Sequence, residues 1–325
     1  MHWDALQQRV QPHAFLRSDF LLCLLDQFGR GKELLAYRED ASGWVAAVLV
    51  QPQGRGRWHS FQPSQLPLGP VLLRDEGIEA ALQSLLRALP GMALVLGLTQ
   101  LDSMTFTGSF DAPRLRQQHY IDTAWVEVDR SFEAYWEARG KNLRQNTRKQ
   151  LKKVEATGVT PRLEVIETPD LVATAIEQYG MLESSGWKAE VGTAISVDGA
   201  QGHFYLQALE RAAAIGQARI YRYWFGDEVV AMDLCLHQGD SLVILKTAYQ
   251  QAHQAVSPST LMRAEEFRAL FDEARFKRIE FFGRVMEWHT RWTDKSRQLF
   301  HLTAYRWAWL KLLHSWRNHG RTQAA

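Results

Sequence analysis

The stretch ARIYRYWFGDEVVAMDLCLHQGDSLVILKTAY, residues 218–249, consists of three runs of apolar and β-branched residues divided by two Gly-Asp pairs. The pairs begin at Gly226 and Gly239, and glycine readily adopts the backbone angles that a tight hairpin turn needs. The stretch therefore predicts an antiparallel meander of three strands over residues 218–225, 229–238 and 241–249.

The next segment, QQAHQAVSPSTLMRAEEF at residues 250–267, predicts the start of a helix. Ser257 is a favourable N-cap, and Pro258 lacks the N–H group that would otherwise be unpaired in the first turn. Two interpretations remain open at this point. Either Ser257 only caps the helix by accepting a hydrogen bond from a first-turn N–H, or the helix terminus binds an anion. The apolar stripe of this helix consists of Leu261, Ala264, Phe267, Leu270 and Phe271.

A similar succession of elements occurs 185 residues earlier in the chain. Residues 33–40 and 44–51 predict a hairpin, residues 78–89 predict an amphipathic helix that ends before Pro90, and residues 92–98 predict a strand. The constant offset favours an internal duplication. The alternative is coincidence, because hairpin, helix and strand in this order are common in α+β proteins.

The length of 325 residues exceeds what one hydrophobic core usually organises, so we expect two domains or one duplicated unit. Cys23 and Cys235 lie in apolar runs without metal-site or redox spacing, which is typical of a reducing compartment. The N-terminal sequence lacks the pattern of a secretory signal, and no apolar run approaches the ~18 residues of a membrane span. These features predict a soluble, cytoplasmic protein without a transmembrane segment.

The formal net charge of +2 is unevenly distributed. Residues 139–153 contain seven Lys/Arg and no acid, and residues 284–325 contain eight Lys/Arg and only two acids, Glu287 and Asp294. The remainder of the chain is net acidic, which favours an anionic ligand over general nucleic-acid binding. Residues 139–155 predict a helix with a basic surface; such a surface also forms simply because it faces solvent. The apolar face of this helix comprises Leu143, Thr147, Leu151 and Val154.

Several segments, in a fixed order, resemble a known family between residue 131 and about residue 317. The order is NLRQNTRKQLKKVEATG, LESSGWKAEVGT, FYLQAL, the meander, AYQQAHQAVSPSTLM, IEFFGRVMEWHTRW and a closing basic helix. Together they resemble GNAT-superfamily acyltransferases of the CelD-like (cellulose or exopolysaccharide biosynthesis) and FemAB-related type. The first 125 residues resemble the weaker N-terminal half of such proteins.

The resemblance implies an α/β (α+β) tandem GNAT-like fold with two mixed sheets flanked by helices. Residues 1–130 would be a degenerate GNAT-like half, and residues 131–325 would be the acyltransferase domain including the basic linker helix 139–155. It also implies acyl-CoA as co-substrate, most simply acetyl-CoA, and no metal. The oligomeric state is not implied.

In a GNAT fold the pantetheine arm of acyl-CoA lies along a strand and the pyrophosphate lies at the next helix N-terminus. The resemblance assigns these parts to Leu245, Lys246, Thr247, Gln254, Ser257, Ser259, Thr260 and Arg263. The chain departs from the GNAT motif where Ser257 and Ser259 replace glycines and Pro258 removes one backbone donor. These replacements predict a weaker phosphate cradle.

Acyl transfer to an amine requires an oxyanion donor, a base for the amine and an acid for the leaving thiolate. Backbone N–H groups of residues 245–247 are the candidate oxyanion donors. His289 is the first candidate for the base, with Glu287 as its competitor, and Tyr249 is the candidate acid. The structural alternative for His289 is a surface or capping histidine.

The predicted substrate-binding residues are Trp187, Lys188, Trp288, Arg291 and Trp292. The alternative for Trp288 and Trp292 is core packing, and the alternative for Lys188 is a solvent-exposed lysine. The expected acceptor is the amino group of a small molecule or of an envelope or exopolysaccharide precursor. Two other function classes remain open. One is a FemAB-like transferase that uses aminoacyl-tRNA, and the other is a catalytically silent GNAT-fold binding subunit.

Overall fold

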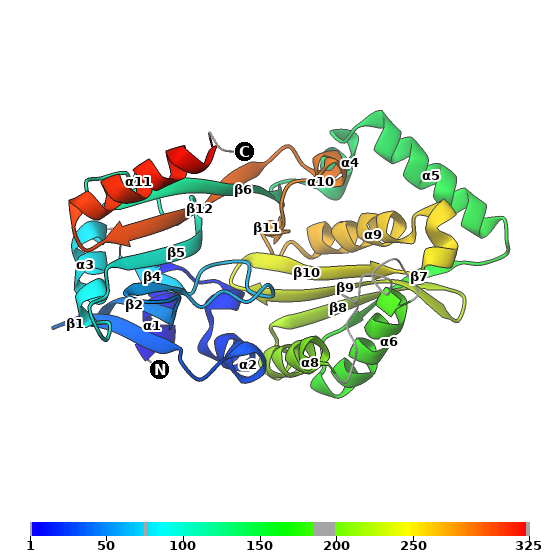
Figure 1. Cartoon of the computed structure of the whole chain (residues 1–325). Coiled ribbons are helices and arrows are strands. Elements are labelled where there is room, and N and C mark those ends of the chain that lie inside the picture. Colours follow the sequence, from blue (N-terminus) through cyan, green and yellow to red (C-terminus); the bar gives the residue numbers. More distant parts are fainter. Residues whose placement is uncertain (1, 75–76, 185–198, 323–325) are drawn as a thin grey trace. The chain divides into compact units, whose positions relative to one another are not determined.

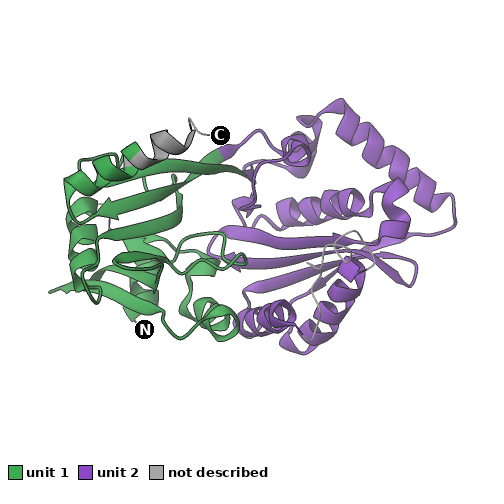
Figure 2. Cartoon of the chain, viewed as in Figure 1, with its two compact units in different colours: residues 1–123, 297–325 green, residues 124–296 purple. Residues whose placement is uncertain are grey.

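A computed structural model describes residues 2–74, 77–184 and 199–322 of the chain (Figure 1). The chain divides into two compact units, one made of residues 1–123 with 297–325 and the other of residues 124–296 (Figure 2). We call them unit 1 and unit 2. Residues 297–325 therefore group with the N-terminal part of the chain, whereas the sequence-based division at residue 130 places them in the second domain.

The meander of unit 2 confirms the strand predictions. Strand β8 spans Ala218–Phe225, β9 spans Glu228–Gln238, and β10 spans Ser241–Tyr249, each antiparallel to the one before it. Gly226 and Gly239 both have a φ of 60°, so the two turns use left-handed backbone that favours glycine. Strand β7 (Pro161–Ile166) pairs antiparallel with β8.

Strand β11 (Arg278–Glu280) lies parallel to β10 but pairs with it over only three residues. The pairing joins Ser241–Val243 to Arg278–Glu280, after which the chain leaves β11 through Phe282, whose φ is +51°. β10 itself continues for six residues beyond Val243. The two strands therefore part, and the second half of β10 is not paired to β11.

A β-bulge interrupts β10 at the point where the strands part. Ile244 pairs with Cys235 and Lys246 pairs with Leu234, so Leu245 is an extra residue without a partner position on β9. A bulge bends its strand and disrupts the local ladder. The backbone that we predicted to supply the oxyanion donors is thus locally irregular.

The remaining elements of unit 2 surround this sheet (Figure 1). Helix α9 contacts β8, β9 and β10, and it buries Phe267, Leu270 and Phe271 in a core shared with Ile279. Helix α5 contacts α9 and buries Leu143 and Val154, as its apolar stripe predicts. Their bounds are α4 Phe132–Glu137, α5 Lys141–Glu155, η2 Pro169–Leu171, α6 Val172–Ser184, α8 Ala200–Ala213, η3 Gln251–Val256, α9 Pro258–Glu273 and α10 Glu287–Trp292.

Unit 1 repeats the strand order of the meander. Its hairpin β1–β2 is antiparallel, β2 pairs antiparallel with β3, and β3 lies parallel to β5, which follows helix α3. In unit 2, β8, β9, β10 and β11 pair in this same succession around α9. The bounds in unit 1 are α1 His2–Val10, η1 Ala14–Leu16, α2 Ser18–Phe28, β1 Leu34–Asp40, β2 Gly43–Pro52, β3 Arg57–Ser60, β4 Val71–Leu73, α3 Ile78–Ala88, β5 Val95–Asp102 and α11 Ala308–Thr322.

The last strands of the two halves are exchanged. Strand β6 (Leu115–Glu127) follows β5 in the chain, but its end pairs with β11, whereas β12 (Ser296–Tyr305) follows unit 2 and pairs with β5. Each repeat is therefore completed by a strand from the other half of the sequence. This exchange explains why residues 297–325 belong to unit 1.

The architecture is a tandem GNAT-like fold of mixed β-sheet flanked by helices, as the sequence predicts, but the strands follow one continuous pairing order instead of forming two separate sheets. The basic helix α5 lies wholly in unit 2, and the chain passes between the units within β6 and near the start of β12. Among the described residues, we find no helix whose length and apolarity together would allow it to cross a membrane.

Candidate functional site

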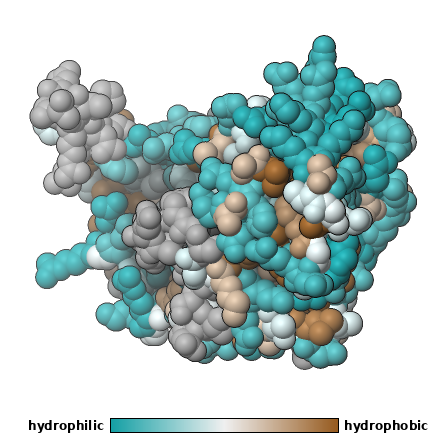
Figure 3. All heavy atoms as spheres, turned by 90° about the vertical axis from the view of Figure 1, so that its right-hand side faces the viewer, coloured by the Kyte–Doolittle hydropathy of each residue, from teal (hydrophilic) through white to brown (hydrophobic). Residues whose placement is uncertain are grey.

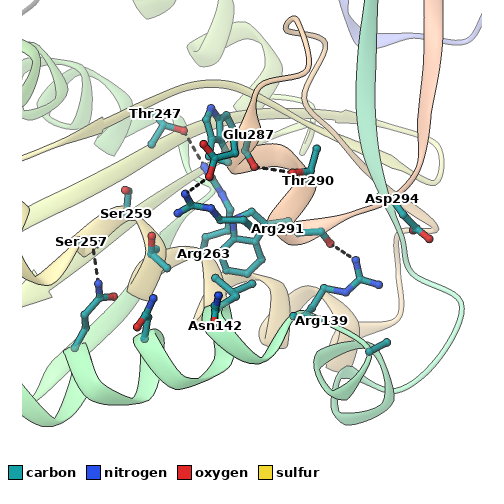
Figure 4. Close-up of a pocket in the computed structure, with 18 of the residues that line it drawn as sticks. Arg139, Asn142, Thr247, Ser257, Ser259, Arg263, Glu287, Thr290, Arg291 and Asp294 are labelled. Carbon is teal, nitrogen blue, oxygen red and sulfur yellow. Dashed lines mark hydrogen bonds and ion pairs between the residues drawn. The ribbon is translucent and has the colours of Figure 1, made fainter.

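A cavity of about 910 Å³ opens in unit 2 where β10 has parted from β11 (Figure 4). Its walls are the second half of β10, the N-terminus of α9, one side of α5 with the loop before it, and α10. The elements come from distant parts of the sequence. The lining residues that matter below are Arg139, Asn142, Asn146, Gln150, Thr247, Tyr249, Ser257, Ser259, Thr260, Arg263, Glu287, Trp288, Arg291, Trp292 and Asp294.

The N-terminus of α9 forms one end of this cavity. Ser257 has left-handed backbone angles, with φ 48° and ψ 64°, and its carbonyl accepts from the N–H groups of Thr260 and Leu261. Its hydroxyl makes no capping bond and instead accepts from Nε2 of Gln150 at 3.2 Å. The interpretation of Ser257 as a side-chain cap is therefore wrong, because its conformation turns the hydroxyl towards α5.

The left-handed conformation of Ser257 is relevant to the replacement of the glycines of the GNAT motif by serines. Glycine adopts such angles without steric cost, whereas a residue with a Cβ does so at a cost of ~1–2 kcal/mol. Ser257 nevertheless holds this conformation, so the loop retains backbone angles suited to glycine after the side chain has changed. Among the described residues, no group accepts a hydrogen bond from the Ser259 N–H, which leaves one donor of the helix terminus available at the cavity.

Arg263 lies one turn into α9 and is committed to an internal ion pair. Its Nη2 donates to Oδ2 of Asp233 at 2.7 Å and to Oγ1 of Thr247 at 2.9 Å. The guanidinium carbon lies 5.1 Å from the ring centre of Trp288. Arg263 therefore touches the cavity with a charge that Asp233 already neutralises.

A buried acid stands beside this pair. Glu266 is fully buried on α9, and burial, followed by the nearby charge of Asp233, raises the pKa of its carboxyl well above the usual range. The attraction of Arg263 opposes this rise only in part. The polar interior around Arg263 therefore contains one ion pair and one acid whose pKa is raised.

The predicted site residues of β10 do not all lie on the same side of the strand. Thr247 and Tyr249 line the cavity. Lys246 points elsewhere, because its Nζ lies 3.3 Å from the buried carboxylate of Glu183 and 5.4 Å from the ring centre of Tyr205. Leu245 does not line the cavity with its side chain, and its role in the prediction concerns only its backbone.

Helix α10 contributes four of its predicted residues to the cavity wall. Glu287 and Arg291 are exposed and form an ion pair at 2.8 Å. Trp288 is half-buried, whereas Trp292 is buried with its ring 5.2 Å from that of Phe267. Trp292 thus packs in the core, whereas Trp288 remains partly exposed at the cavity.

His289 is buried behind the cavity wall. Its Nδ1 accepts from the Met286 N–H at 2.9 Å, and its ring stacks on Trp288 at 3.6 Å. Burial, aided by the positive charge of Arg263, lowers its pKa to about 4, although the Met286 bond opposes the change. The imidazole is therefore neutral at neutral pH and acts in the capping arrangement of α10.

Gln254, which was also predicted as a site residue, does not line the cavity. Gln254 is exposed on η3, where its Oε1 accepts from Gln251. Trp187 and Lys188 lie outside the described residues.

Helix α5 provides a wall of the cavity that was not predicted from the sequence. Asn142, Asn146 and Gln150 recur every four residues and therefore lie on one side of the helix, which faces the cavity. Arg139 precedes the helix and donates from Nη1 to the Trp292 carbonyl at 3.0 Å. The regular spacing of these three amide side chains can be seen in the sequence. It lies next to the basic surface of the helix, however, and is equally typical of a helix face that is exposed to solvent. Within the described ranges, no group of three or more His, Cys, Asp or Glu is placed to hold a metal ion.

Comparison with known proteins identifies the family of the chain. Residues 141–316 match the family described as the acetyltransferase (GNAT) domain, and the chain belongs to that family. No curated protein sequence matches the chain.

Three solved structures share the fold at low sequence identity. The C-terminal domain (DUF2156) of a candidate lysylphosphatidylglycerol synthetase from Agrobacterium fabrum has a TM-score of 0.60 and 13% identity, over 93% of this chain and 90% of that one. L-PGS from Bacillus licheniformis has a TM-score of 0.55 and 14% identity, over 94% and 91%. FemX has a TM-score of 0.58 and 9% identity, over 94% and 95%. At such identities these likenesses concern the fold alone.

Proposed function

We propose that the protein transfers an acyl group from acyl-CoA, with acetyl-CoA as the first donor to test, to an amino group of an acceptor. The observation that carries this proposal is the parting of β10 from β11 after Val243 and Glu280. It leaves the edge of β10 open next to the α9 N-terminus, and both border the same cavity. The extended pantetheine arm of an acyl-CoA thioester would lie along the open edge of β10, and its phosphates would lie at the adjacent N-terminus of α9.

The α9 terminus supplies the phosphate end of the donor site. The positive end of a helix dipole and unpaired N–H groups stabilise an anion. Ser259 offers its N–H, and the hydroxyls of Ser259 and Thr260 border the cavity. Arg263 contributes less than we expected from sequence, because Asp233 holds its guanidinium.

The other residues have roles that follow from their positions. Backbone N–H groups at the Leu245 bulge would stabilise negative charge on the carbonyl oxygen as the amine attacks. Glu287 lines the cavity and would take the proton from the amine, directly or through water. Tyr249 would donate its proton to the departing thiolate. These assignments favour Glu287 over His289 as the base, because His289 is buried and its Nδ1 is occupied.

The cavity wall supports a polar acceptor. The three amides of α5 can both donate and accept hydrogen bonds, and the partly exposed Trp288 side chain adds apolar surface to the wall. A saccharide precursor carrying an amino group combines polar hydroxyl and amino groups with apolar C–H surface. We therefore retain an envelope or exopolysaccharide precursor as the proposed acceptor class.

One observation favours aminoacyl-tRNA as a second candidate donor. The side chains of α5 that are exposed to solvent include Lys141, Arg148, Lys149, Lys152 and Lys153. Much of the molecular surface on the side where α5 lies is hydrophilic (Figure 3). A row of cations beside the cavity suits a phosphate backbone.

Purified protein should be titrated in parallel with acetyl-CoA and with charged tRNA, and thiol release should be followed in the presence of amino sugars. We expect saturable binding of acetyl-CoA and amine-dependent release of free CoA. Binding and turnover with charged tRNA alone would replace the first donor by the second. Binding of either donor without transfer to any amine would identify a silent binding subunit.

A further inference from the structure

Helix α11 is attached to unit 1 along one side. Nδ1 of His314 and the hydroxyl of Tyr305 share a hydrogen bond. Nζ of Lys311 donates to Oδ1 of Asp111 at 2.7 Å and to the Ala112 carbonyl at 2.9 Å. These contacts fix which side of the helix faces the unit.

The other side of α11 presents an apolar stripe to solvent. Trp309, Leu312, Leu313 and Trp316 follow the i, i+3, i+4, i+7 spacing of one helical face. Their exposed fractions are 53%, 71%, 49% and 78%, and they line a shallow hollow of about 470 Å³. Contiguous apolar side chains at such exposure mark an interaction surface.

The charge of the segment that contains this apolar stripe indicates which kind of partner it would bind. Residues 306–325 contain Arg306, Lys311, Arg317 and Arg321 but no Asp or Glu. Even with Lys311 paired to Asp111, the segment keeps an excess of positive charge. The partner should therefore be apolar in part and carry negative charge.

We propose that α11 docks on an anionic lipid surface. Tryptophan is enriched where membranes meet water, because its ring is apolar and its N–H stays hydrated. A helix with an aromatic and leucine face and basic residues lies in the plane of such an interface and binds anionic lipid most strongly. This inference concerns unit 1 and is independent of the donor proposed for unit 2.

A second copy of the chain is a poorer occupant for two reasons. A symmetric dimer would bring the same basic segment from each copy together, which opposes association. The stripe also offers four side chains, whereas stable interfaces use about 20–30 residues on each side. Lipid needs neither a large area nor a complementary shape.

The test is co-sedimentation of the full chain with vesicles of phosphatidylcholine alone and of phosphatidylcholine with 30% phosphatidylglycerol, on the order of 100 nm in diameter. We expect binding to the anionic vesicles that weakens with salt. Leu312→Ser and Trp316→Ala should each reduce the partition coefficient about tenfold, because each removes one large apolar side chain from the bilayer. Leu22→Ser, at 56% exposure on α2, is the matched control and should bind like the parent protein.

Equal binding to both vesicle compositions would overturn the anionic specificity, and the absence of binding by the parent protein would overturn the proposal as a whole. Parent-like partition of both α11 variants would also overturn it. Sedimentation equilibrium provides the competing outcome: a dimer that Leu312→Ser dissociates would assign the stripe to a second copy of the chain. Both side chains are exposed, so circular dichroism should show unchanged folding.

Discussion

Arg263 and Asp233 form an ion pair of 2.7 Å whose side chains are only 6% and 0% exposed. Asp233 lies on β9 and Arg263 on α9, so the pair fastens the helix to the sheet at the floor of the cavity. Arg263 bonds Thr247 on β10 as well. One guanidinium thus links three elements that also shape the site.

Asp233→Asn should strongly destabilise the fold. Removing one partner of a buried pair leaves the other charge without compensation, at a cost of ~3–5 kcal/mol. Urea denaturation should show this loss in the free energy of unfolding. The control is Lys277→Ala, which breaks the exposed Lys277–Asp240 pair of 3.7 Å and should change stability little. Comparable losses in both variants would show that Arg263 is not held by Asp233 in solution.

Glu266→Gln should change the pH dependence of stability. The raised pKa of Glu266 means that the folded state binds a proton that the unfolded state has released above its ordinary pKa of 4.5. Stability therefore falls as pH rises above 4.5, by at most about 1.4 kcal/mol per pH unit, until the folded carboxyl itself ionises. Glutamine imitates the protonated acid, so its variant should be more stable at pH 8 and show a smaller slope.

Denaturation curves from pH 5 to 8 provide the measurement for Glu266. Parallel slopes in the parent and the variant would mean that Glu266 is ionised in the folded state.

Most of the fold could be predicted from the sequence, because the patterns that predict its turns, strands and helices are local. Gly226 and Gly239 delimited the meander to within one residue, and the spacing of apolar residues revealed α9 and the inner face of α5. The exchange of β6 and β12 was not predicted, because strand pairing between residues far apart in sequence leaves no periodic trace. The strand predicted from residue 92 begins at Val95.

The candidate site could be predicted only in part, because its contacts join residues that are far apart in sequence. Residue types near Ser257 and Glu287 indicated the cavity, but the partners of Arg263 and Ser257 lie 30 and 107 residues away in sequence. Nor does sequence reveal that His289 turns inward, since its neighbours on α10 face the cavity. The spacing of residues in the sequence predicts which of them share a helix face, whereas tertiary packing determines what that face contacts.

Ser257→Gly and Ser257→Ala should differ in stability although both lose the bond to Gln150. Only glycine relieves the left-handed strain at φ 48°. We therefore expect the glycine variant to be more stable than the alanine variant by about 1 kcal/mol. Thermal unfolding of the pair measures the difference directly. Equal melting temperatures would indicate that Ser257 relaxes to ordinary angles in solution.

Asn146→Phe should obstruct the cavity without disturbing the helix. Asn146 lines the cavity from the exposed surface of α5, so a larger ring can enter the cavity without displacing core side chains. Donor affinity measured by calorimetry should fall at least about tenfold, or ~1.4 kcal/mol. Gln145→Phe adds the same ring at an exposed neighbour that does not line the cavity. If that control lost affinity equally, the effect would belong to the helix rather than to the cavity.

Glu287→Gln and His289→Asn should separate catalysis from stability. Glu287 lines the cavity, so its amide variant should lower turnover by ~10²–10⁴ and leave donor binding intact. His289 has a pKa of about 4 when folded against 6.5 otherwise, so the unfolded state binds more protons between these values. Its contribution to stability is therefore complete above pH 6.5 and is lost as pH falls towards 4. The asparagine variant should retain turnover and show a weaker fall in unfolding free energy over that range. If it instead lost turnover while Glu287→Gln kept it, the base would be the histidine, and the wall of α10 would have to open for the amine to reach it.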